Sequence, residues 1–296
     1  MHSVKVDTGF ETETLQYIWD KYQNWNGSPA GTFGGQLQRR QRQPEYAGFY
    51  FYLVFVYLHK CPQLNWIEAF RSADGQFKAC ARSFTEHVWA TADALANIIE
   101  EIDYSWRLDP YNHALPPFDQ SITGIVDTLP IYIATPHYWW LSSLFFQPKY
   151  KACVLKMQLG ISLLGDVILW TGPHLGVTSD TTIWETTWAE HPFCAWERWL
   201  ADLGYVGCIG LIYKFKKVAG RALSRAQLIF NNVHEHTRNR VEQVVSVMKA
   251  HRIFKRGNFR GSYHHLRPFL VIVGHVTAYE LRKFQRFNSY GPWAHR

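Results

Sequence analysis

The stretch that decides the fold is residues 145–180, FFQPKYKACVLKMQLGISLLGDVILWTGPHLGVTSD. It contains two β-rich runs, residues 154–163 and 167–170, which are divided by a Gly-Asp pair and closed by a Gly-Pro pair. Short apolar runs bounded by Gly and Pro are typical of strands in a sheet. The stretch therefore predicts two neighbouring strands and a loop that ends at Asp180.

The segments on either side complete a mixed sheet. Upstream, residues 122–126 form a short apolar run that ends at Asp127, and residues 131–134 form another. Downstream we expect a helix from Asp180 to about residue 190, a strand over 208–213, and a long helix that begins after Ser224 as its N-cap and ends near residue 251. Several strands followed by alternating helix and strand predict an α+β fold, an RNase H-like mixed sheet with flanking helices.

The sequence divides into three predicted regions. Residues 1–45 end in a Gly-, Gln- and Arg-rich arm, residues 46–110 are helical, and residues 111–296 hold the sheet. In the helical region, a short helix over 66–70, a turn with Gly75 and a longer following helix have the outline of a helix-turn-helix that presents Lys78 and Arg82. An ordinary three-helix bundle has the same outline, so both interpretations stay open.

Composition favours a nucleic-acid partner and a reducing compartment. The 296 residues carry a formal net charge of +7, which favours contact with phosphates. The five cysteines are odd in number and form no CxxC pair, which argues against disulfides and structural zinc. The N-terminus has no signal-peptide pattern, and the apolar run over 47–58 is too short to span a bilayer. We therefore expect a nuclear or a cytoplasmic protein without a membrane segment.

Three acids form a candidate metal site. Two-metal cleavage of a phosphodiester needs carboxylates that converge at a sheet, because hard divalent ions prefer oxygen ligands. Asp127 follows the first predicted strand, Asp180 follows a glycine-containing loop, and Glu242 lies within the last long helix. Each also has an ordinary explanation: Asp127 as turn chemistry, Asp180 as a helix N-cap, and Glu242 as a solvated helical residue.

Four short blocks surround these acids in a fixed order. They are PKYK at 148–151, GPHLGVTSD at 172–180, LADLGYVG at 200–207, and an FN pair at 230–231 that is followed by Arg238 and Glu242. In this order the blocks resemble those of PIF/Harbinger-type DDE transposases, over roughly residues 120–282. Arg238 and Glu242 are one helical turn apart and therefore share a face.

The resemblance implies a function and its site. It implies a DDE-type endonuclease or transposase in which Asp127, Asp180 and Glu242 hold Mg²⁺ or Mn²⁺, with Asp202 and Arg238 in supporting positions. The chain departs from the family pattern at three places. It has Asp-Thr-Leu-Pro where many members have DGT after the first acid, Ser179 where they have His, and Glu235 where they have a small polar residue.

Basic side chains mark the expected contacts with DNA. The segment over 251–267 interleaves basic and aromatic residues, a composition suited to phosphate contact and base stacking. A solubilising loop before a last helix over 271–284 is the other interpretation. The paired histidines at 234 and 236, and at 264 and 265, have no ligand partner at zinc spacing. The predicted nucleic-acid-binding residues are Lys78, Arg82, Lys149, Lys151, Arg252, Lys255, Arg256 and Arg260.

Two functions from different classes follow from the sequence. The first is a transposase-like enzyme that cuts DNA with metal-activated water and joins strands, acting as a homodimer and with a separate DNA-binding protein subunit, as the resemblance implies. The second is a domesticated relative that binds DNA or a protein partner without cutting. The three retained acids favour the first, and the altered surroundings of Asp127 and Asp180 keep the second open.

Overall fold

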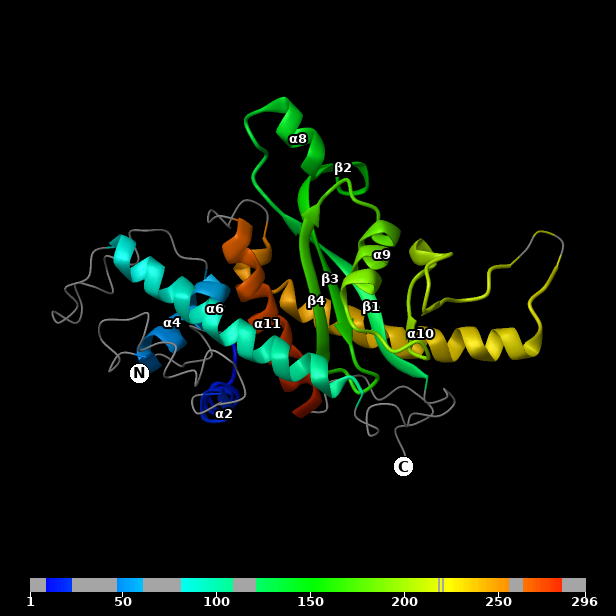
Figure 1. Cartoon of the computed structure of the whole chain (residues 1–296), viewed down its shortest axis with the longest axis horizontal. Helices are drawn as coiled ribbons and strands as arrows, with labels where there is room; N and C mark the ends of the chain where they lie inside the picture. The colour runs from blue at the N-terminus through cyan, green and yellow to red at the C-terminus, as the bar shows by residue number, and fades with distance from the viewer. Residues whose placement is uncertain are drawn as a thin grey trace. The chain divides into compact units, whose positions relative to one another are not determined.

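The computed structural model describes residues 9–22, 47–60, 81–108, 121–217, 219, 221–255 and 263–283 of the chain. It contains two compact units. Unit 1 comprises Met1–Glu101 and Met248–Val276, and unit 2 comprises Ile102–Val247 and Thr277–Arg296. Within the described ranges the fold is a mixture of seven α-helices and a mixed sheet, and the elements are labelled in Figure 1.

Unit 2 is built on a six-stranded mixed sheet with the order β2-β3-β1-β5-β6, and β4 pairs with β3. Strands β2, β3 and β4 are antiparallel to their neighbours, whereas β5 runs parallel to both β1 and β6. The strands are β1 (Ile122–Tyr132), β2 (Phe146–Gln147), β3 (Ala152–Ile161), β4 (Val167–Leu175), β5 (Arg198–Leu200) and β6 (Leu211–Ile212). The helices are α8 (Trp139–Phe145), α9 (Asp180–Glu190) and α10 (Arg225–Met248), with short 3-10 turns η2 (Pro148–Tyr150) and η3 (Leu203–Tyr205).

Strand β1 corrects the prediction for Asp127. The sequence predicted a strand that ends at this residue and a separate run over 131–134, but β1 continues through Asp127 to Tyr132. Pro130 is tolerated because β5 pairs only with Ile122–Ile125, so this part of β1 has β3 alone as its partner. Proline is compatible with a strand edge that lacks a second neighbour. Asp127 is therefore held in regular strand geometry.

Helices α9 and α10 each begin after a serine that acts as the N-cap. Ser179 is the N-cap of α9, and its hydroxyl accepts a hydrogen bond from the Thr182 amide at 3.0 Å, so Asp180 is the first helical residue rather than the cap. Ser224 caps α10 as predicted, through a bond from the Gln227 amide at 3.2 Å. The Gln227 side-chain oxygen in turn accepts a bond from the Ser224 amide at 2.9 Å, which completes a capping box.

The two faces of the sheet are covered by different helices. Side chains alternate along a strand, so neighbouring residues point to opposite faces. Val126 packs in a buried cluster with Trp184 of α9 and with Trp199 of β5. Asp127 points the other way and contacts Arg238 of α10. Figure 1 shows α9 and α10 on opposite sides of the sheet.

Unit 1 is helical in its described part. Its helices are α2 (Thr12–Tyr22), α4 (Ala47–Lys60), most of α6 (Ala81–Trp106) and most of α11 (Tyr263–Lys283), with the 3-10 turn η4 (Arg252–Phe254). Helix α11 begins eight residues earlier than predicted, and Arg267 within it pairs with Glu100 at 2.6 Å. The predicted arm over 24–45, the short helix over 66–70 and the turn at Gly75 lie outside the described residues. None of the described helices has the length and apolar character that crossing a bilayer requires.

A buried histidine in unit 1 generates a pH-dependent stability prediction. His251 stacks on Phe10, with ring centroids 4.7 Å apart, and meets the His59 ring edge-on at 5.4 Å. Burial, and secondarily His59, lowers the pKa of His251 from 6.5 to about 4. As the pH falls, His251 is therefore protonated in the unfolded chain before it is protonated in the folded chain. The contribution of neutral His251 to the free energy of unfolding is complete above about pH 6.5 and is lost as the pH falls toward 4.

We expect wild type to lose about 2 kcal/mol more unfolding free energy than His251→Phe between about pH 8 and about pH 5. Urea denaturation at both pH values measures this difference, and phenylalanine keeps an aromatic ring against Phe10. Equal pH dependence of the two proteins would show that protonation of His251 is not resisted by the fold.

Candidate functional site

The α10 side of the sheet brings two of the predicted acids together around one guanidinium. Nη1 of Arg238 lies 3.7 Å from Oδ2 of Asp127. Nη2 of the same arginine makes an ion pair with Glu242, one turn further along α10. The Arg238 side chain is only 15% exposed, so these two contacts are partly shielded from water. The i,i+4 pair expected from the sequence is present, and the arginine also reaches across to β1.

Asp202 joins this group from the turn that follows β5. Ala201 packs in the α9-side cluster, and Asp202 follows it with an extended backbone. Alternation along the strand therefore directs the Asp202 side chain toward the α10 side. Although Asp202 is the N-cap residue of η3, its side chain makes no capping hydrogen bond.

The pKa of Asp127 indicates that Asp202 and Glu242 lie close enough to interact with it electrostatically. Burial raises the pKa of the Asp127 carboxyl above its ordinary value. A hydrogen bond from the Thr128 amide at 2.8 Å and the charge of Arg238 lower this pKa, whereas the carboxylates of Asp202 and Glu242 raise it. Like charges that interact in this way would be relieved by an additional cation.

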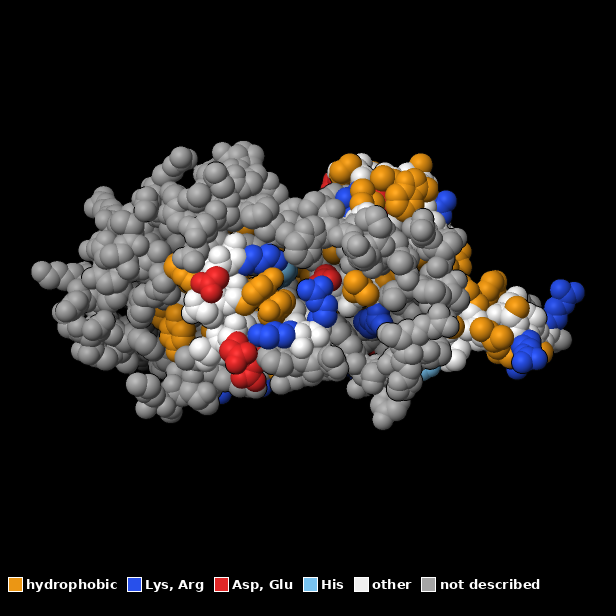
Figure 2. All heavy atoms as spheres, turned by 90° about the horizontal axis from the view of Figure 1, so that it is seen from below, with side chains coloured by type: hydrophobic (Ala, Val, Ile, Leu, Met, Phe, Trp, Pro, Cys, Tyr) orange, Lys and Arg blue, Asp and Glu red, His pale blue; other side chains and the backbone are white. Residues whose placement is uncertain are grey.

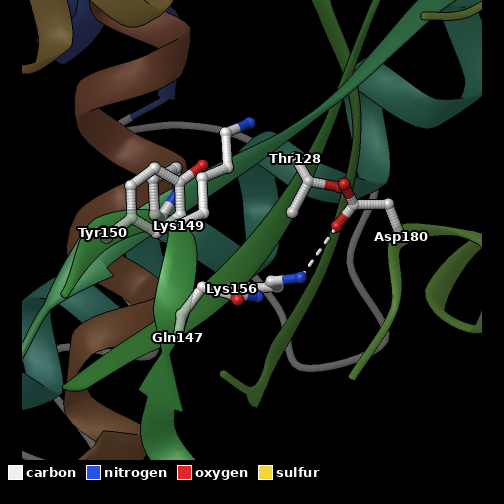
Figure 3. Close-up of a pocket in the computed structure, with 7 residues that line it drawn as sticks. Thr128, Gln147, Lys149, Tyr150, Lys156 and Asp180 are labelled. Carbon is white, nitrogen blue, oxygen red and sulfur yellow. Dashed lines mark hydrogen bonds and ion pairs between the residues drawn. The ribbon is translucent and has the colours of Figure 1, made fainter. Parts of the chain in front are cut away.

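Asp180 lies in a different environment, on the α9 side. Oδ1 of Asp180 is 3.0 Å from Nζ of Lys156 in β3, and the same ammonium donates to the Thr178 carbonyl at 2.7 Å. The Lys156 side chain is 8% exposed and the Asp180 side chain 37% exposed. Figure 3 shows this ion pair at the edge of a pocket. Asp180 therefore balances a buried ammonium.

The pocket beside Asp180 is small and mostly polar. Its volume is about 80 Å³, and Thr128 lines it from β1. The Thr128 hydroxyl is also 2.5 Å from the Tyr205 hydroxyl, whose pKa is raised by burial. The full lining is Thr128, Pro130, Gln147, Lys149, Tyr150, Lys156 and Asp180.

Lys156 was not predicted from the sequence as part of a site, and Asp202 was predicted in a supporting position. A signal for Lys156 was available, because a single lysine in the apolar run VLKMQLG must be buried and needs a partner. The signal for Asp202 was weaker. Strand β5 has three residues, too few for an alternating pattern to reveal which way Asp202 faces.

The acids on the α10 side suit a divalent cation in their chemistry. Asp127, Asp202 and Glu242 offer only oxygen ligands, which hard divalent ions prefer. Arg238 already places a positive charge between Asp127 and Glu242. In the described part of the chain, no three His, Cys, Asp or Glu side chains are close enough to hold one ion. Shared binding of a metal would therefore require these side chains to move closer than they are here.

The predicted nucleic-acid-binding residues fall in several places. Lys149 and Lys151 are exposed on either side of Tyr150 in unit 2, and Lys149 lines the pocket in Figure 3. Arg252 and Lys255 are exposed at η4 in unit 1. Lys78, Arg256 and Arg260 lie outside the described residues, and Arg82 is in the first turn of α6 with a side chain that is not described.

Comparison with known proteins identifies the family. A mixed sheet with carboxylates facing a long helix is compatible with the fold of a DDE nuclease. The family model of the DDE superfamily endonucleases matches residues 126–274, just over half of the 296 residues. The chain belongs to this family. No curated protein and no solved structure matches the chain.

The two partners of the Asp180 ion pair should differ in their effect on stability. Asp180→Asn leaves the buried Lys156 ammonium with the Thr178 carbonyl as its remaining partner, whereas Lys156→Met leaves a carboxylate that is already part-exposed. We expect the first change to cost about 2–3 kcal/mol and the second about 1 kcal/mol.

A double-mutant cycle measures this difference. Urea denaturation of the two single variants and of the double variant Asp180→Asn/Lys156→Met should show that the double variant is more stable than Asp180→Asn alone. Additive losses would mean that the two side chains do not depend on one another.

Proposed function

We propose that this chain is a Harbinger-type DNA endonuclease of the transposase class, and that Asp127, Asp202 and Glu242 on an RNase H-like sheet are its catalytic acids. The observation that carries this proposal is that the three carboxylates lie on the α10 side of β1 and interact electrostatically, although they are not close enough here to share one ion. Each comes from a different element, and Asp202 and Glu242 both raise the pKa of Asp127.

This proposal exchanges the roles that the sequence suggested for Asp180 and Asp202. Asp180 is engaged by Lys156 on the α9 side, and its charge is balanced there. Asp202 follows the strand that pairs directly with β1, in the parallel direction, and its side chain makes no capping bond. In this parallel register Leu200 pairs with Ile125, so Asp202 and Asp127 each lie two residues further along their adjacent segments.

The proposed cofactor is Mg²⁺ or Mn²⁺, held by these carboxylates. When bound, it supplies activation of the attacking water and stabilisation of the leaving oxygen. The residues themselves provide the charge pattern. Arg238 neutralises Asp127 and Glu242 in the absence of a bound cation, and release of those carboxylates would leave the guanidinium available to a DNA phosphate.

The remaining proposals rest on the resemblance to Harbinger-type transposases. Such enzymes bring two DNA ends together, which favours a homodimer, and they commonly act with a separate DNA-binding subunit. A DNA substrate favours a nuclear location over a cytoplasmic one. The assignment of the three catalytic acids does not depend on the homodimer, the DNA-binding subunit or the nuclear location.

A second function is favoured by one specific observation. Arg238 contacts both Asp127 and Glu242, an arrangement that is satisfied without metal. A domesticated relative that binds DNA without cutting it would retain such an arrangement. The two functions differ in whether the chain cuts DNA when a divalent cation is supplied.

We expect Mn²⁺-dependent nicking of supercoiled DNA by the full chain, and a loss of at least 100-fold in Asp202→Asn, because the amide removes a charged ligand. The variant Asp180→Asn/Lys156→Met should nick at a rate close to wild type. Calorimetric titration with Mn²⁺ provides a readout that does not depend on activity, and the affinity should fall in Asp202→Asn.

Three results would contradict parts of this proposal. Full activity in Asp202→Asn together with loss of activity in the double variant would assign catalysis to Asp180. Mn²⁺ binding that is unchanged in Asp202→Asn would remove this residue from the ligand set. No nicking by wild type, with DNA binding intact, would favour the non-cutting relative.

A further inference from the structure

A basic segment in unit 2 has no role in the site described above. Between Leu203 and His234 the chain contains five lysines and arginines and no aspartate or glutamate. The segment after β6 runs away from the sheet and returns at the start of α10, as Figure 1 shows. We call residues 213–225 the basic arm. Its charged residues are Lys214, Lys216, Lys217, Arg221 and Arg225.

Four of the five cations have no partner within the described chain. Lys214 makes an ion pair with Glu235 at 2.9 Å. The other four side chains are exposed, and none of them makes an ion pair with the described residues. Figure 2 shows basic side chains gathered with apolar ones at the projecting end of unit 2. Unpaired like charges in one segment repel each other, so they favour a polyanionic partner.

Both ends of the basic arm are fastened to α10. The Asn231 side chain accepts a bond from the Phe215 amide at 2.8 Å and donates one to the Phe215 carbonyl at 3.0 Å. The ring of Phe215 also meets that of Phe230 edge-on, with centroids 5.4 Å apart. At the other end the capping box of Ser224 fixes the start of the helix. The cations next to these anchors are therefore held near α10.

Helix α10 sets the distance from the basic arm to the acids. Arg225 and Glu242 lie on the same helix, and the 1.5 Å rise per residue places them about 25 Å apart along its axis. In B-form DNA with a rise of 3.4 Å per base pair, this corresponds to about 7 base pairs.

We propose that the basic arm is a DNA-binding element that contacts the phosphate backbone about 7 base pairs from the position of the three acids. It fits duplex DNA because four of its five cations are exposed and make no ion pair with the described residues, and because both ends of the segment are anchored to α10. The position of the contact rests on the proposed function, whereas DNA binding by the basic arm does not.

The test compares two variants of equal charge change. Lys217→Gln/Arg221→Gln/Arg225→Gln removes three cations of the basic arm, including Arg225, which sets the distance to the acids. Lys21→Gln/Lys249→Gln/Lys283→Gln removes three from elsewhere in the chain, and Lys249 follows the opposite end of α10. Fluorescence anisotropy with a duplex of about 30 base pairs, titrated at several salt concentrations, gives the affinity and its salt dependence.

We expect the arm variant to bind at least tenfold more weakly at about 0.1 M salt. The slope of log affinity against log salt should become shallower by about 2 to 3, because each phosphate contact contributes about 0.9. The matched control should keep both values close to wild type. Equal losses of DNA affinity in the two variants would attribute binding to net charge. If neither variant lost DNA affinity, the basic arm would instead be assigned to binding an acidic protein surface. Both results would overturn the proposal.

Two further measurements keep this test separate from that of the catalytic acids. Asp202→Asn should bind DNA with the wild-type salt slope, since the acids are not the source of phosphate affinity. Among duplexes of decreasing length, the difference between wild type and the arm variant should vanish once the DNA extends less than about 7 base pairs from the cutting position. A difference that persists on shorter DNA would contradict the distance set by α10.

Discussion

The arrangement of unit 2 depends on the packing of Trp199 against two glycines. The indole of this fully buried residue lies over Gly124 of β1 and Gly160 of β3, where a side-chain carbon would stand 2.5 and 2.6 Å from its ring. Any larger residue at either position would displace the ring or the strand. Close packing of this kind makes the spacing of β1, β3 and β5 insensitive to small movements. Those three strands carry Asp127 and Lys156 and lead into Asp202.

The same packing explains why charged groups can lie so close to a core. Burial of an unpaired charge is strongly unfavourable, and each charged side chain on the inner strands has a partner or an exposed edge. Lys156 has Asp180 and a backbone carbonyl, and Arg238 has two carboxylates. The two ion-pair groups lie on opposite faces of the sheet. The Lys156–Asp180 pair is balanced in charge, whereas the group on the α10 side contains three acids for one arginine and therefore has an excess of negative charge.

Sequence reasoning succeeds here where the signal is local. The capping box of Ser224, the Arg238–Glu242 pair and the presence of β3 and β4 are each encoded within a few residues. It fails where the signal depends on distant partners. Lys156 and Asp180 are 24 positions apart, and the facing of Asp202 depends on a three-residue strand that gives no period. Asp127 was predicted at a strand end because the apolar run over 122–126 stops there, whereas β1 continues through it and tolerates Pro130 because β5 pairs only with residues up to Ile125.

Helix α10 runs from the end of the basic arm to the region of the three acids. Its second half is packed, with Val241, Val244 and Met248 fully buried. Its first half exposes Leu228 and Ile229 and has little apolar packing to stabilise it. A helix without packing depends on its caps and on specific anchors, which here are Ser224, Asn231 and the bond of the His234 ring to the Ile212 carbonyl at 3.1 Å. These anchors keep the helix continuous from the basic arm to Glu242, so the proposed phosphate contact at one end would fix the position of DNA relative to the acids at the other.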